Sequence, residues 1–263
     1  MGNKMSNAPV YYSLAQVRFN SVTALEQYVP KIQDTFRKAG YPDFQKLVVA
    51  TLALTKSSES QLPTFQQQAR YHLLNESKTA GFIVEASSIS FQTTDYETFE
   101  PFSAAFTKGL GILHDALELS YSERIGMRML DAVVPKDGEK LSSYLTSSVL
   151  GLTDQLGQEG LVHSISETRT KRGKANLNSR SIIQRQDTAG VAFPEELHPV
   201  PIEVGAKFKG VTGLYGIIDT DSWVEERAKF DVGGLEKTLD SLHAEITLSF
   251  SHMVTEHAIA VWK

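Results

Sequence analysis

The densest group of residues able to do chemistry is a set of six basic side chains between residues 169 and 185. Such a set suits contact with phosphate groups, with RNA or with an acidic partner surface. Its alternative role is that of a solvated edge strand, whose charges discourage aggregation. No aromatic residue interleaves with these cations, which disfavours the stacking of single-stranded nucleic acid. The candidate partner-binding residues are Arg169, Lys171, Arg172, Lys174, Arg180 and Arg185.

Metal binding is the second chemistry to consider, because the chain has seven histidines. It has no cysteine, which excludes disulfides, cysteine-ligated zinc sites and iron–sulfur clusters held by cysteine. His252 precedes the pair Glu256-His257 but misses the spacing of the H-x-x-E-H zinc motif by one residue. Asp219 and Asp221 end an expected strand, where such pairs usually bond to the backbone of a turn rather than hold a cation. We therefore expect no metal and no cofactor.

Motifs for nucleophilic catalysis and phosphate binding are missing from the chain, which lacks G-x-S-x-G, Walker A and G-x-G-x-x-G patterns. Gly109 and Gly111 fall inside an expected helix and cannot form a phosphate loop. His114 and His243 lie beside the apolar stripes of two expected helices, where a histidine is usually a hydrogen-bonded boundary residue. No catalytic residue is assigned, so the sequence favours a non-enzymatic role and leaves the question of enzymatic activity open.

Length and composition describe one globular unit over residues 1–263, with a net charge of −5 and 41% hydrophobic residues. A chain of this size buries a substantial core without disulfides. The acidic balance disfavours wholesale nucleic-acid wrapping. The first residues lack the apolar stretch of a signal peptide, and no run approaches the roughly 18 apolar residues of a membrane span. We expect a cytoplasmic protein without membrane contact.

The hydrophobic pattern of the first half predicts short strands around two helices. A helix over residues 97–118 is the strongest prediction, because Phe and Leu residues recur every three or four positions, after a capping box of Thr94 and Glu97. A polar stretch at 56–68 is expected to be a loop. The other expected elements are strands at 10–19, 47–54, 71–76, 81–85, 88–93 and 124–134 and a helix at 24–38.

The second half is expected to repeat this plan. A short helix at 141–150 precedes a hairpin of strands 163–170 and 175–184, which turns at Gly173. A proline-rich crossing at 193–201 leads to a strand at 214–219. Asp231 is a good N-cap for a second long amphipathic helix, which runs to about residue 253.

The order of these elements predicts an α+β fold made of two similar halves, at about 8–135 and 136–263. Each half would be an antiparallel sheet covered on one face by a long helix, and the two would share one sheet. Identity between the halves is slight, so the internal duplication is inferred from element order alone.

Six short segments of the chain form a set: AQVRF (15–19), RKAGYP (37–42), FQTTDY (91–96), ERIG (123–126), DTD (219–221) and AIAVWK (258–263). Together they resemble a sporadically distributed prokaryotic family of uncharacterised proteins of about this length. They occur in the same order over nearly the whole chain, and the resemblance brings no established catalytic or binding residue. Patchy distribution is typical of mobile genes, such as those of defence or toxin–antitoxin systems.

Two functions from different classes follow from these observations. The first is a non-enzymatic binding or adaptor protein of a mobile defence or toxin–antitoxin-like system, with a protein partner docking on the basic hairpin. Self-association of the chain is left open beside it. The second is a small-ligand-binding protein or enzyme with a pocket between sheet and helix. We favour the first; a cavity holding unpaired polar residues would favour the second.

Overall fold

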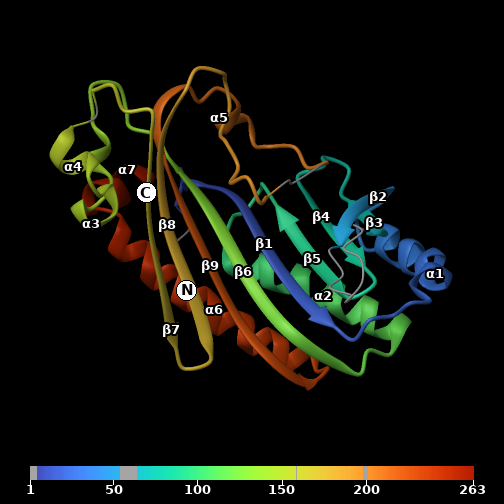
Figure 1. The fold of residues 1–263 in the computed structure, drawn as a ribbon. Helices are drawn as coiled ribbons and strands as arrows, with labels where there is room; N and C mark the ends of the chain where they lie inside the picture. Colours follow the sequence, from blue (N-terminus) through green and yellow to red (C-terminus); the bar gives the residue numbers. More distant parts are fainter. Residues whose placement is uncertain (1–4, 54–63, 158, 198–200) are drawn as a thin grey trace.

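The computed structural model describes residues 5–53, 64–157, 159–197 and 201–263, and its centre is one antiparallel sheet of nine strands (Figure 1). The strands follow the spatial order β2-β3-β4-β5-β1-β6-β9-β8-β7. They are β1 (Val10–Phe19), β2 (Asp43–Ala53), β3 (Thr64–Leu74), β4 (Ala80–Glu85), β5 (Ser88–Thr93), β6 (Tyr121–Val133), β7 (His163–Arg172), β8 (Ala175–Gln186) and β9 (Gly213–Lys229).

The helices divide into two long ones, one of intermediate length and several short ones. They are α1 (Leu25–Lys38), α2 (Phe99–Leu117), α3 (Ser147–Leu150), α4 (Thr153–Leu156), α5 (Ala206–Lys209), α6 (Val232–Met253) and α7 (Glu256–Trp262). Within the described residues no helix is both long and apolar enough to span a membrane. The α+β class and the single shared sheet are confirmed.

The two long helices lie on the same face of the sheet, as Figure 1 shows. Phe106 of α2 and Leu242 of α6 are both buried in one core cluster with sheet residues such as Met127 of β6. Both helices therefore bury their apolar stripes against antiparallel strands, as predicted from the spacing of Phe and Leu. Helix α1 packs beside α2 and extends this layer.

A crossing segment, residues 187–197 and 201–212, packs on the opposite face of the sheet and contains α5. Tyr11, Tyr12 and Tyr215 are buried there in a separate core cluster, against which Phe193 packs. Tyr11 donates a hydrogen bond to the carbonyl oxygen of Ala192 at 2.8 Å. Aromatic packing and hydrogen bonds thus hold the crossing segment on the sheet.

The two expected helix caps differ in outcome. Asp231 caps α6, because its carboxylate accepts hydrogen bonds from the backbone N–H groups of Gly233 and Gly234. The capping box at α2 is wrong: the N-cap is Thr98, whose side chain makes no capping bond. Thr94 instead donates to the carbonyl oxygen of Glu203, so it ties the crossing segment to the sheet.

Three other expectations differ from the structure. Strand β3 takes in residues 64–68 of the stretch expected to be a loop at 56–68, and the rest of that stretch lies outside the described residues. The expected helix at 141–150 is a single 3-10 turn, Leu141–Ser143, followed by α3. Strand β9 continues to Lys229, past the point where we expected a turn, because it stays paired with β6 as far as Tyr121. The six strands β1–β6 come from the first half and the three others from the second, and the internal duplication stays a prediction.

Two glycines of α2 provide a matched test of this packing. A Cβ built on Gly109 would lie 2.1 Å from Cε1 of the buried Phe82 ring, whereas one on Gly111 meets nothing within 4 Å. We expect Gly109→Ala to lower the free energy of unfolding by about 1–3 kcal/mol through overpacking. Gly111→Ala should raise it by up to about 1 kcal/mol through helix propensity. Urea denaturation of both variants measures the difference, and equal effects would contradict this placement of α2.

Candidate functional site

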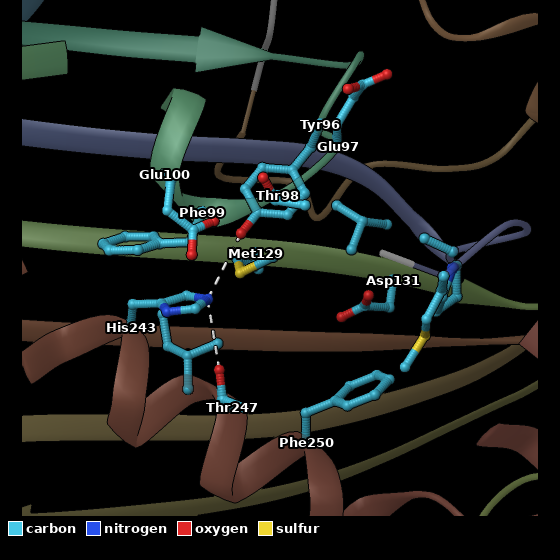
Figure 2. Close-up of a pocket in the computed structure, with 15 residues that line it drawn as sticks. Tyr96, Glu97, Thr98, Phe99, Glu100, Met129, Asp131, His243, Thr247 and Phe250 are labelled. Atoms are coloured by element: carbon cyan, nitrogen blue, oxygen red, sulfur yellow. Dashed lines mark hydrogen bonds between the residues drawn. The ribbon is translucent and has the colours of Figure 1, made fainter. Parts of the chain in front are cut away.

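A cavity of about 340 Å³ lies where the sheet, the start of α2 and the second half of α6 meet (Figure 2). It opens between strands β1 and β6 on one side and the two long helices on the other. Most of its wall is apolar or aromatic, and its few polar side chains come from three different elements. The lining residues are Met5, Ala8, Pro9, Val10, Tyr96, Glu97, Thr98, Phe99, Glu100, Met129, Asp131, His243, Ile246, Thr247 and Phe250.

Asp131 places a carboxyl group in this cavity. Alternation along β6 turns Met127, Met129 and Asp131 toward the helices, so the carboxyl continues a row of apolar side chains. The residue is only 4% exposed, and its carboxyl group points into the hollow (Figure 2). The described part of the chain offers this carboxyl group no hydrogen bond or ion pair. Burial, and to a lesser extent the nearby charge of Asp219, raises its pKa to about 8.

His243 of α6 faces the cavity from the opposite side (Figure 2). Its ring stacks on Phe99, with 3.9 Å between ring centroids. Its Nε2 lies 3.5 Å from the hydroxyl oxygen of Tyr96 and 3.4 Å from that of Thr247, which are long contacts. Burial lowers the pKa of His243, with Glu100 and Asp240 opposing this, so the imidazole is neutral at pH 7.

Three further titratable residues line the same space: Tyr96, Glu97 and Glu100. Burial raises the pKa of Tyr96, so this residue keeps its hydroxyl proton at neutral pH. Glu100 lies at the rim and is ionised, because its own backbone N–H and the Thr98 hydroxyl lower the pKa of its carboxyl group. Among the described lining residues there is no lysine or arginine. The cavity thus joins an apolar body to oxygen and nitrogen atoms able to accept hydrogen bonds.

An ion cluster occupies the opposite face of the sheet and contains one of the predicted partner-binding residues. Arg128 holds both carboxylate oxygens of Asp219 at 2.7 Å, and Arg180 approaches one of them at 2.5 Å. Glu196 of the crossing segment accepts hydrogen bonds from both arginines. Partial burial would raise the pKa of Glu196, but these hydrogen bonds outweigh it and hold the pKa at about 2. Arg180 therefore serves the internal packing of the sheet.

The other five predicted residues lie along the β7–β8 hairpin and the strand end that follows it. Lys174 pairs with Glu226 at 2.7 Å, and Arg172 lies 3.6 Å from Glu245. The guanidinium of Arg169 lies over the Trp223 ring, 4.8 Å from its centroid. No ion pair of Lys171 or Arg185 is found among the described residues. Because β7 is the last strand of the sheet, these charges also suit the protection of an exposed edge, and partner binding stays a prediction.

The acidic and histidine patterns do not come together as a metal site. Asp219 and Asp221 sit inside β9 rather than in a turn, and Asp219 is bound by arginines, so the expected turn is wrong. His252 belongs to the last turn of α6, whereas His257 lies on α7 and contacts Glu139 at 3.3 Å. Within the described ranges no group of three or more His, Asp or Glu side chains is placed to hold a metal ion.

Comparison with protein-family models gives no match, and comparison with curated proteins gives none either. The resemblance to a sporadically distributed prokaryotic family therefore stays a prediction. The interpretation of the site rests on its geometry.

Sequence reasoning missed Asp131 and Tyr96 and treated His243 as a boundary residue. One signal for Asp131 was present: in the strand expected at 124–134, it alternates with Met127 and Met129 and so falls on their apolar face. A carboxylate in such a row is informative, because charged residues are seldom buried without a partner. No pattern in the sequence showed that α2 and α6 leave a hollow over that residue.

The buried carboxyl group of Asp131 gives a prediction for stability against pH. Its pKa is raised from about 3.9 in the unfolded chain to about 8 in the fold. The contribution of Asp131 to the free energy of unfolding is therefore most favourable below pH 4. It is lost progressively as the pH rises toward 8, because the carboxyl group of the unfolded chain releases its proton at a lower pH than that of the folded protein. Asp131→Asn cannot ionise and should be more stable than the wild type at pH 8.5, by on the order of a few kcal/mol.

Denaturant unfolding at pH 5 and pH 8.5 measures this effect. The difference in unfolding free energy between Asp131→Asn and the wild type should be smaller at pH 5 than at pH 8.5. Asp137→Asn, at an exposed position, is the matched control, and its difference from the wild type in unfolding free energy should change little between the two pH values. An advantage of the same size at both pH values would contradict the raised pKa of Asp131.

The ion cluster predicts unequal contributions to stability from two basic residues of the β7–β8 hairpin, Arg180 and Lys171. Arg180→Ala leaves Asp219 and Glu196 each with one partner fewer and should lower the free energy of unfolding by about 3 kcal/mol. Lys171→Ala, on the exposed strand β7, should change it by less than about 0.5 kcal/mol. Thermal or urea unfolding measures both variants. An equal loss of unfolding free energy in Arg180→Ala and Lys171→Ala would contradict the special structural role of Arg180.

Proposed function

We propose that the protein binds a small organic ligand in the cavity between the sheet and helices α2 and α6. The observation that carries this proposal is the carboxyl group of Asp131, buried without a described partner and directed into an apolar hollow. An unsatisfied buried polar group costs free energy that a hydrophobic residue at this position would not. A ligand that pairs with the carboxyl group would offset this free-energy cost and would account for a carboxyl group at this position.

Several features of the cavity support ligand binding rather than mere loose packing. Its volume falls in the usual range of small-molecule sites. Polar groups from three elements converge on it: Tyr96 before α2, Asp131 of β6 and His243 of α6. This is the arrangement of an apolar pocket with a few orienting polar groups.

The adaptor function that the sequence favoured takes second place in this proposal. It depends on the basic hairpin, where Arg172, Lys174 and Arg180 already have carboxylate partners within the chain. That pairing reduces the charge available to a protein partner. The proposal keeps a role in a mobile defence or toxin–antitoxin-like system, self-association and a cytoplasmic location. It also keeps an origin of the two halves by duplication. The long helices that follow β5 and β9 on the same face of the sheet support this origin.

Filling the cavity tests the proposal. Thr247 lines the cavity from α6, whereas Ala244 is exposed on the same helix and is no part of the wall. A mixed fragment library of amines, alcohols and carboxylic acids is screened by ligand-observed NMR. Fragments that bind the wild type should bind Thr247→Trp about tenfold more weakly or worse, equal to a loss of at least about 1.4 kcal/mol.

Ala244→Trp is the control and should bind the same fragments as tightly as the wild type. Thermal unfolding of both tryptophan variants checks that each is folded at the screening temperature. A screen without binders, or binders whose affinity is the same for Thr247→Trp as for the wild type, would contradict a ligand site in this cavity.

A further inference from the structure

We propose that the ligand of this cavity is an amphipathic organic cation, an amine attached to an apolar or aromatic group, with its ammonium seated against the Asp131 carboxylate. This inference rests on the proposed ligand-binding function and names its chemical class. It follows from which atoms line the cavity and how they are distributed between its walls.

The apolar part of such a ligand would pack on the apolar wall of the cavity. Phe99 and Phe250 contribute aromatic rings from α2 and α6, and Val10, Met129 and Ile246 contribute aliphatic surface. Phe250 is also packed on Trp262 of α7, with 6.0 Å between ring centroids, which supports its position. Aromatic faces favour an apolar group and a neighbouring cation together.

The polar part of the cavity is suited to a donor of several hydrogen bonds. An ammonium group has hydrogen-bond donors and no acceptor. Around the hollow stand the carboxyl group of Asp131, the hydroxyl oxygen of Tyr96 and the ring of neutral His243. A charge-assisted bond to Asp131 is the strongest of these contacts. A ligand hydroxyl would satisfy fewer of these atoms, and a ligand carboxylate would meet a second carboxyl group.

The charged groups around Asp131 agree with this assignment. On the cavity side stand Glu97 and Glu100, together with Tyr96 and His243. On the far side of the sheet stand Tyr11, Arg128 and Asp219, and Asp219 is already paired with Arg128. No described lysine or arginine lines the cavity, and an ammonium group of the ligand would supply a positive charge that stabilises ionised Asp131.

Binding of a cation is then coupled to release of one proton. At neutral pH the free protein holds Asp131 mainly as the carboxylic acid, because burial raises its pKa to about 8. An ammonium beside it favours the carboxylate, so neutral Asp131 and the ammonium ligand give an ion pair and one proton passes to the solvent. A neutral ligand leaves the proton on Asp131.

Three matched probes test the assignment: phenethylamine, phenethyl alcohol and hydrocinnamate, which share an aromatic ring on a two-carbon chain and differ in the polar end. Isothermal titration calorimetry on the full chain at pH 7 gives their affinities. Repeating the phenethylamine titration in phosphate and in Tris, whose enthalpies of ionisation differ, counts the protons released. We expect phenethylamine to bind at least about tenfold more tightly than the other two and to release close to one proton.

Variants at Asp131 assign the preference to this carboxyl group. Asp131→Asn should lose both the preference for the amine and the release of protons, and Asp131→Glu should retain part of each. Asp137→Asn, at an exposed position, should behave as the wild type. Thermal unfolding of each variant confirms that it is folded at the titration temperature.

The possible failures of the two proposals are distinct. Equal or tighter binding of the alcohol or the carboxylate, or a preference for the amine that survives in Asp131→Asn, would overturn the cationic ligand and leave the ligand site standing. Binding of only neutral or anionic fragments in the wider library would have the same meaning. Failure of all three probes together with a fragment library that yields no binder would overturn both proposals.

Discussion

The alternation of side chains along β6 is the constraint on which both faces of the molecule depend. This strand joins the two halves of the chain, because it pairs with β1 on one side and with β9 on the other. It sends Arg128 to one face, where the arginine holds Asp219, and Asp131 to the other, where the carboxyl group reaches the cavity. A shift of its register by one residue would exchange these faces, bringing Arg128 under the helices and Asp131 under the crossing segment.

Each face of the sheet has a buried aspartate, and the two aspartates differ in their partners. Asp219 is 3% exposed and bound by Arg128 and Arg180, so its charge is compensated within the chain. Asp131 is 4% exposed and has no such partner among the described residues, so its acid form is favoured. The first arrangement fastens the crossing segment through Glu196. The second leaves a carboxyl group without a partner among the described residues, and this is the physical basis of the proposed ligand site.

Much of the fold could be predicted from the sequence, because periodicity reports which faces are buried. Phe106 and Leu242 identified the two long helices, and Asp231 identified the start of α6. The order of the strands was beyond reach, since it depends on pairing between segments far apart in the chain, such as β6 with β9. The candidate site was missed for the same reason. Asp131, Tyr96 and His243 are distant in sequence and become neighbours only when α2 and α6 settle on the sheet.

Asp131 is a buried carboxyl group with no partner among the described residues, and the proposed ligand site depends on this property. NMR titration of isotope-labelled aspartate carboxyl carbons, with Asp131 assigned from the spectrum of Asp131→Asn, measures its pKa directly in the free protein. The structure predicts a midpoint near pH 8, far above that of an exposed aspartate. A midpoint near pH 4 would mean that water or a basic group already compensates this carboxylate, and it would contradict the proposed role of Asp131 in the cavity.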